Sequence, residues 1–239
     1  MRSLKKMVRD QYFFPGILGI FINPAYFARK SVYETLLRFA PRVSGRLLDA
    51  GCGSKPYQHL FKNVTNYIGM EFDSKENRER KGPDIFYDGK TFPFANDSFE
   101  SVLSTEVLEH VFNPDQHIQE IKRVLKPKGM LLLTTPLIWG EHQEPYDYGR
   151  YTSFGLCDIL KRNGFEIIEY RKNMTGILVA FVILTIYMRT LLDVRNYYLK
   201  TALNIVFISP ITILGYFLSL ILPSDDRIYI GNAVLAQKR

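Results

Sequence analysis

The stretch Leu47–Gly53 constrains the fold of this chain more than any other part of the sequence. It has the pattern of an apolar strand that ends at an acid, Asp49, and runs into a turn with two glycines, Gly51 and Gly53. Glycines at such a turn let the backbone approach a bound molecule closely. An ordinary strand-to-turn junction with no ligand has the same pattern.

Asp49 narrows the choice of ligand at this turn. Dinucleotide and ATP sites present bare N–H groups and a helix N-terminus to phosphates, and a carboxylate pointing into such a site would repel them. The third glycine of G-x-G-x-x-G is also absent, because Pro56 stands in its place. These two residues disfavour a nucleotide-dependent dehydrogenase. A nucleoside with a cationic end and no phosphate suits the acid better, and S-adenosylmethionine (AdoMet) is such a ligand.

Segments with strand and helix character alternate from residue 46 onward. The apolar patterns predict strands and helices. The strands are expected at Arg46–Ala50, Asn66–Glu71, Asp84–Tyr87, Phe99–Thr105, Met130–Thr135, Phe165–Tyr170 and Ile228–Ala236, and the helices near Lys55–Lys62, at Pro114–Leu125 and at Ser153–Asn163, the last capped by Ser153. This alternation predicts an α/β fold with a doubly wound parallel sheet. Its ligand should lie at the carboxyl ends of the strands, where Asp49 and Gly51 fall.

A series of short motifs follows these strands in order. They are Asp49-x-Gly51-x-Gly53, Tyr67–Glu71, Asp88-Gly89 followed by Phe92–Phe94, Ser98-Phe99, the TEVLEH segment Thr105–His110, and Leu125-Lys126-Pro127-x-Gly129. In this order and spacing, the chain resembles the class I AdoMet-dependent methyltransferases from about Asn23 to Lys172 and again from Ile228. The resemblance implies a Rossmann-like, doubly wound sheet of seven strands, the last of them antiparallel, with AdoMet as the cofactor.

The cofactor site can be assigned partly from the residues and partly from the resemblance. Glu71 lies at a strand end where an acid can accept hydrogen bonds from both ribose hydroxyls. Asp88 could accept from the adenine amine beside Gly89, or could simply form an Asp-Gly turn. The resemblance places Asp49 near the methionine amino group and Thr105 and Glu106 beside the methyl donor. The full predicted cofactor-binding set is Asp49, Gly51, Cys52, Gly53, Glu71, Phe72, Asp88, Gly89, Thr105 and Glu106.

The loop Glu141–Tyr151 is dense in ionisable and aromatic groups and follows the fifth strand. Methyl transfer from a sulfonium mainly requires alignment of the acceptor, with a base only where the acceptor must lose a proton. Histidine titrates near neutral pH, so His142 is the predicted general base. Tyr146, Asp147 and Arg150 are predicted to shape the acceptor pocket, and the alternative is a loop held by its own salt bridges.

His110 completes the predicted catalytic set. A helix start with a hydrogen-bonded histidine is the alternative for Glu109 and His110. Cys52 has an alternative role as a small buried side chain. No metal site is predicted.

Two apolar runs interrupt the α/β pattern. No charged residue occurs in Asn173–Met188 or in Thr201–Ser224. The second run is near the roughly 20 residues needed to cross a bilayer, and the first is shorter. An apolar helical hairpin lying in the membrane interface or re-entrant is therefore predicted between strands six and seven. Burial against the domain or in a homodimer is the alternative.

The net charge of +7 is concentrated at the N-terminus. Residues 1–46 contain nine Lys and Arg against two acids, interleaved with aromatic side chains. This pattern favours an anionic membrane surface and disfavours nucleic acid, because the basic residues form no dense patch. Two cysteines and no signal peptide predict a cytoplasmic protein, peripheral or monotopic on the membrane. The predicted organisation is an N-terminal helical cap (1–45), a methyltransferase core (46–172), the hairpin (173–227) and a final core strand (228–239).

These features together predict methyl transfer to a small-molecule or lipid-linked acceptor at a membrane, such as a glycan, a lipid head group or a quinone-like ring. One alternative is a methyltransferase with a soluble acceptor whose hairpin forms a dimer interface. Another is a non-catalytic membrane scaffold with the same fold. The presence of Asp49, Gly51, Gly53 and Glu71 argues against the scaffold.

Overall fold

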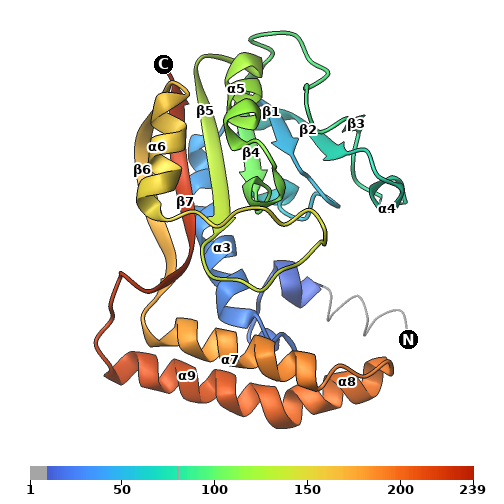
Figure 1. The fold of residues 1–239 in the computed structure, drawn as a ribbon, viewed down its shortest axis with the longest axis vertical. Helices are drawn as coiled ribbons and strands as arrows, with labels where there is room; N and C mark the ends of the chain where they lie inside the picture. Colours follow the sequence, from blue (N-terminus) through green and yellow to red (C-terminus); the bar gives the residue numbers. More distant parts are fainter. Residues whose placement is uncertain (1–9, 80) are drawn as a thin grey trace. The chain divides into compact units, whose positions relative to one another are not determined.

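A computed structural model describes residues 10–79 and 81–239, and in this part of the chain seven strands form one sheet in the order β3-β2-β1-β4-β5-β7-β6 (Figure 1). The strands are β1 (Gly45–Ala50), β2 (Val64–Phe72), β3 (Ile85–Tyr87), β4 (Phe99–Thr105), β5 (Leu125–Pro136), β6 (Phe165–Thr175) and β7 (Tyr229–Lys238). The pairs from β3 across to β5 are parallel, and β7 pairs with β5 in the antiparallel direction. The predicted Rossmann-like sheet is confirmed.

The core is built by strands whose side chains are buried on both faces. Leu47 and Leu48 of β1 and Leu131–Leu133 of β5 are almost completely buried, as expected for parallel strands covered by helices. Helices α5 (Pro114–Val124) and α6 (Ser153–Arg162) lie together on one side of the sheet (Figure 1). This packing fixes the carboxyl ends of the parallel strands, from which the site loops emerge.

Two local predictions are wrong. The helix expected near Lys55–Lys62 is only the short 3-10 turn η2 (Gln58–Leu60). Lys55 has a positive φ of 54°, outside the right-handed helical region, so a regular helix does not begin at this residue. The cap of α6 is Thr152 rather than Ser153, because the Thr152 side chain accepts the hydrogen bond from the N–H of Gly155 at 3.2 Å.

The chain divides into two compact units. One contains Leu36–Arg171 and Gly231–Arg239, and the other contains the described part of Met1–Thr35 together with Lys172–Ile230. The expected boundary at residue 45 therefore shifts into helix α3 (Tyr26–Phe39), and the N-terminal segment and the insertion share one unit. Part of the basic N-terminal charge noted in the sequence lies outside the described residues, at Arg2, Lys5, Lys6 and Arg9.

The insertion between β6 and β7 is a helical hairpin, as predicted. Its first arm is α7 (Ile177–Leu191), and its second is continuous through α8 (Tyr197–Leu203), the π-helical turn η4 (Asn204–Ile208) and α9 (Ser209–Ile221). Helices α7 and α9 pack together, and a Cβ placed at Gly215 would lie 2.6 Å from Cβ of Phe181. The short helix α2 (Gly19–Ile22) contacts the second arm.

Candidate functional site

Asp49 lies in the middle of the sheet, paired with Gly69 of β2 on one side and Leu103 of β4 on the other. Only 4% of the residue is exposed, and the hydroxyl of Tyr67 donates to its Oδ2 at 2.6 Å. Burial raises the pKa of Asp49 to about 7, against the lowering effect of the Tyr67 hydrogen bond. A buried carboxylate of this kind is stabilised by a cationic ligand group.

The turn after β1 is shaped by two glycines with different surroundings. Gly51 has a φ of 86°, its N–H donates to the carbonyl of Met70 at 2.8 Å, and a Cβ placed on it would collide with Val107. Gly53 has a φ of 51°, and within the described residues a Cβ there would meet no heavy atom within 4 Å. Gly51 is thus required by packing, whereas Gly53 leaves open space beside the turn.

Glu71 connects the end of β2 to this turn. Its Oε2 accepts from the N–H of Gly53 at 2.8 Å, and its Oε1 accepts from the N–H of Phe72 at 3.1 Å. The carboxylate is therefore held at the edge of the open space by backbone donors. Cys52 is buried, and burial raises the pKa of its thiol, so it acts as a small core side chain beside the turn.

Asp88 follows β3 and forms a local turn. Its Oδ1 accepts from the N–H groups of Lys90 at 2.8 Å and Thr91 at 3.0 Å, and these bonds lower the pKa of Asp88. Gly89 has a φ of 81°, and a Cβ on it would lie 3.0 Å from the Phe72 ring. The Asp-Gly turn considered from the sequence is present, and the carboxylate remains exposed beside it.

Thr105 is the last residue of β4, and Glu106 follows it. Glu106 has a φ of 55°, and its Oε1 accepts from the hydroxyl of Thr134 at 2.8 Å. The Oγ1 atom of Thr105 is buried and has no hydrogen-bond partner among residues 10–79 and 81–239. A buried hydroxyl without a partner is uncommon in folded proteins, and a bound ligand would supply one.

The loop after β5 is tied together by an ion pair. Arg150 donates to both oxygens of Asp147, at 2.5 and 2.7 Å, and the N–H of His142 donates to Asp147 Oδ2 at 3.0 Å. The pKa of Asp147 is held well below its usual range, mainly by Arg150. Asp147 and Arg150 therefore position the loop and its histidine, while Tyr146 is half exposed and its ring lies 6.0 Å from that of Phe72.

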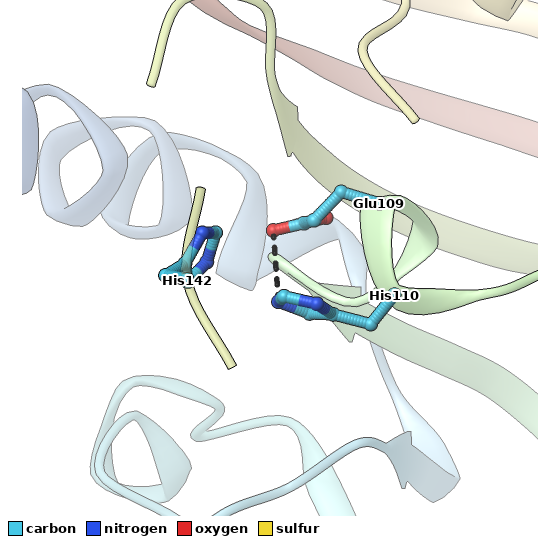
Figure 2. A group of neighbouring side chains, drawn as sticks. All are labelled: Glu109, His110 and His142. Carbon is cyan, nitrogen blue, oxygen red and sulfur yellow. Dashed lines mark ion pairs between the residues drawn. The ribbon is translucent and has the colours of Figure 1, made fainter. Parts of the chain in front are cut away.

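Three side chains of the same unit converge where this loop meets the end of β4. Figure 2 shows Glu109, His110 and His142 pointing toward one another. Glu109 and His110 come from the 3-10 turn η3 (Leu108–His110), and the loop returns to them because the N–H of Tyr148 donates to the carbonyl of Glu109 at 2.7 Å. One potential ligand atom from each of the three lies within 4.8 Å of the others.

The sequence singled out His110 and His142 separately and assigned no ligand role to Glu109. Glu109 is fully buried, and burial, aided by the nearby Glu106, raises the pKa of Glu109 well above its usual range. Burial also lowers the pKa of His110. The signal available in the sequence was the adjacent Glu-His pair after β4, but its partner lies 32 residues further along the chain.

Comparison with known proteins finds a methyltransferase domain in this chain. Residues 48–133 match the family model described as "Methyltransferase domain". An uncharacterized methyltransferase of Mycobacterium leprae is 36% identical over 103 residues, which cover 40% of this chain and 38% of that protein. An uncharacterized methyltransferase of Mycobacterium tuberculosis is 36% identical over 102 residues, covering 39% of this chain and 40% of that protein. The chain thus spans about two fifths of the length of these relatives.

Solved structures share the fold at low sequence identity. The phosphoethanolamine N-methyltransferase 2 of Haemonchus contortus in complex with AdoMet has a TM-score of 0.54 and 21% identity, over 87% of this chain and 52% of that one. An AdoMet-dependent methyltransferase from Mesorhizobium loti has a TM-score of 0.52 and 17% identity, over 87% and 98% of the two chains. The match to a methyltransferase domain and the fold shared with these AdoMet-dependent methyltransferases support the predicted class and the predicted cofactor, AdoMet.

Proposed function

We propose that this protein transfers the methyl group of AdoMet to an amphiphilic or lipid-linked acceptor at a membrane surface. The observation that carries the membrane part is the apolar hairpin. The continuous helix Tyr197–Ile221 is long and apolar enough to cross a bilayer, and only 28% of its most apolar window is buried.

The proposed cofactor site rests on the turn after β1 and on Glu71. When bound, AdoMet supplies an electrophilic methyl group on a cationic sulfur. Asp49 offers a buried carboxylate to the amino end, Glu71 offers its carboxylate to the ribose hydroxyls, and the open space at Gly53 admits a ligand close to the backbone. The hydroxyl of Thr105 offers a further hydrogen bond.

The proposed acceptor site rests on the loop after β5. The contact between Nδ1 of His142 and Asp147 Oδ2 measures 3.2 Å, so the carboxylate orients the imidazole. His142 is thereby a candidate base for a hydroxyl acceptor, and Tyr146 offers an exposed aromatic face beside Phe72 for a ring-shaped one. This geometry supports acceptors with hydroxyl groups on a ring.

The proposed membrane attachment is supported by the side chains that the hairpin leaves exposed. Apolar residues exposed on α7 and on the second arm include Ile183, Leu184, Tyr187, Leu191, Val206, Leu214, Phe217, Leu220 and Ile221. An apolar surface of this extent normally has a partner. Gly231 of β7, which follows the hairpin in the chain, pairs with Pro136 at the carboxyl end of β5.

The test uses AdoMet labelled in its methyl group, with purified protein and a lysate of its host, followed by solvent partition. Label in the lipid extract, lost in Glu71→Ala, is the expected result. Label confined to the aqueous phase would reject the lipid acceptor and keep the enzyme. Absence of any label, together with absence of AdoMet binding by calorimetry, would reject methyl transfer and favour a scaffold.

Membrane attachment can be tested separately by vesicle flotation. Phe217→Asp, on the exposed face of α9, should reduce flotation with vesicles of mixed anionic lipid. Phe154→Asp is the matched control, because Phe154 is 87% exposed on helix α6 of the core. If the wild type sediments as a clean dimer without detergent and does not float, the hairpin is a dimer interface instead.

A further inference from the structure

We propose that Glu109, His110 and His142 bind one divalent transition-metal cation. Two imidazoles and a carboxylate are the donor set of many zinc sites that keep a position open for water or substrate. The three side chains point toward a common centre (Figure 2), and their ligand atoms lie within 4.8 Å of one another. Metal binding itself does not depend on the proposed function, but its role in catalysis does.

The hydrogen bonds of the two histidines leave one nitrogen of each for the cation. Nδ1 of His110 lies 2.8 Å from the carbonyl oxygen of Tyr146. Nδ1 of His142 lies 3.2 Å from both the carbonyl oxygen of Gly140 and Asp147 Oδ2. Metal-binding histidines in proteins typically donate their second nitrogen to a carbonyl or carboxylate in this way. Nε2 is therefore the nitrogen that each ring offers to a metal.

Two of the atoms that would bind the metal are buried and have no hydrogen-bond partner in the described part of the chain. Among residues 10–79 and 81–239, neither Oε1 of Glu109 nor Nε2 of His110 has one, although both atoms are buried. They lie 3.8 Å apart, and the side chain of Glu109 is completely buried. Its other oxygen, Oε2, accepts from the hydroxyl of Thr135 at 3.3 Å. One oxygen is thus anchored, and the other faces His110 without a donor.

The charge of this region favours a cation. Glu106 lies near Glu109, Asp147 lies near His110, and the guanidinium of Arg150 is bound to Asp147 through two hydrogen bonds. Arg150 is thus engaged by Asp147, and the completely buried acid Glu109 is the group that a cation would compensate. Because an uncompensated buried carboxylate is costly, a divalent cation would restore the balance.

The distances require only a small adjustment. Metal–ligand bonds of about 2.0–2.1 Å in a tetrahedral site place ligand atoms about 3.3 Å apart. The separation of 3.8 Å between Glu109 and His110 exceeds this by about 0.5 Å, and the limit of 4.8 Å for the set exceeds it by at most about 1.5 Å. His142 lies in a loop with 32% of its side chain exposed, so a small shift of the loop that carries the ring and Asp147 together can close the gap.

Such a cation would change the role of His142 from general base to ligand. An acceptor hydroxyl bound at the open position would lose its proton to solvent more readily, as metal-bound water does. The acceptor oxygen then forms a bond to the methyl carbon as the carbon–sulfur bond breaks, and that electron pair remains on sulfur as a neutral thioether. The acceptor class is therefore a molecule with a hydroxyl group on a ring, able to bind a metal.

The test is titration of the full chain, stripped with a chelator, with Co²⁺, followed by its visible absorption and by calorimetry. The wild type should bind one equivalent. Glu109→Gln and His142→Gln should each weaken Co²⁺ binding at least tenfold, and Zn²⁺ should displace the Co²⁺ signal. His59→Gln is the matched control, because His59 is exposed and follows the cofactor turn instead. It should bind Co²⁺ like the wild type.

Two outcomes would overturn the proposal: wild type that binds no Co²⁺, or His142→Gln that binds it unchanged. AdoMet calorimetry on each variant verifies folding, and if Glu109→Gln fails to fold, His142→Gln in the exposed loop decides. Co²⁺ binding without any methyl transfer would reject the proposed function and leave the metal site intact. Methyl transfer that is unaffected by the chelator, with no Co²⁺ bound, would reject the metal site and leave the proposed function intact.

Discussion

The hydrogen bond between Tyr67 and Asp49 offers a direct test of how the cofactor site works. Asp49 is buried, and its pKa of about 7 reflects burial opposed by the hydroxyl of Tyr67 at 2.6 Å. Glu71 raises the pKa of Asp49 further and Lys55 lowers it. Tyr67→Phe removes only the hydroxyl, so it should raise the pKa of Asp49.

The size of the effect follows from the strength of this bond. A hydrogen bond to a charged group contributes about 1.5–3 kcal/mol, and one pKa unit corresponds to about 1.4 kcal/mol. The pKa of Asp49 should therefore rise by about one to two units in the variant. At pH 7 the ionised fraction of Asp49 would fall from about half to less than about a tenth.

The direction of the pH dependence is fixed by the charge of the ligand. If the amino group of AdoMet binds the Asp49 carboxylate, affinity falls about tenfold for each pH unit below the pKa of Asp49. In Tyr67→Phe this fall begins at higher pH, so AdoMet should bind about tenfold more weakly at pH 7. The ratio of the AdoMet affinities of the wild type and Tyr67→Phe should be largest at pH 6 and should decrease toward pH 7.5.

Calorimetric titration with AdoMet between pH 6 and pH 7.5 checks this prediction. Tyr170→Phe is a suitable control, because its hydroxyl also makes a 2.6 Å hydrogen bond but to the neutral Asn232. It should leave the pH profile of AdoMet affinity unchanged. A Tyr67→Phe affinity that is reduced equally at every pH would refute the reasoning, since lost packing alone gives a constant factor.

Three further predictions concern other parts of the molecule. Gly53→Ala should lower the free energy of unfolding by only about 1 kcal/mol yet abolish AdoMet binding, whereas Gly51→Ala should also destabilise the fold strongly in urea titrations, because its Cβ has no room. Burial lowers the pKa of His117 to about 4, whereas the unfolded chain takes up this proton near pH 6.5. His117 should therefore cost about 3 kcal/mol of stability at pH 4. The free energy of unfolding of His117→Leu should fall less than that of the wild type between pH 7 and pH 4.5. Gly215→Val should force α7 and α9 apart at Phe181, which limited proteolysis of the hairpin should detect as faster cleavage.

The sheet and the cofactor turn could be predicted because their signals are local. Asp49 and Gly51 belong to one short stretch, and β4 has the predicted bounds Phe99–Thr105. The start of β5 was placed at Met130, because the Lys-Pro-Lys-Gly segment before it is typical of a helix end. In the structure, Leu125 is already extended and pairs with Phe99, so strand pairing extends β5 beyond its apolar segment.

The convergence of Glu109, His110 and His142 could not be predicted in the same way. The sequence gives no measure of where a long loop returns. The return depends on two backbone N–H groups, those of Tyr148 and Gly149, which donate to the carbonyl of Glu109 at 2.7 and 3.1 Å. Such bonds carry no side-chain signature, which is why the two histidines were assigned separate roles.

The carboxyl edge of the sheet gathers several acids, although the chain as a whole is basic. The protein carries +7, yet Asp49, Glu71, Glu106, Glu109 and Asp147 all lie at or just beyond the carboxyl ends of β1, β2, β4 and β5. Carboxylates in such a setting favour cations and repel phosphates. These acids thus favour both a sulfonium cofactor and a divalent metal. They also restrict where an acceptor can carry a phosphate. A phosphate adjacent to the reacting atom would be repelled, so in a lipid-linked acceptor the methylated hydroxyl should be on a ring that keeps its phosphate away from this edge.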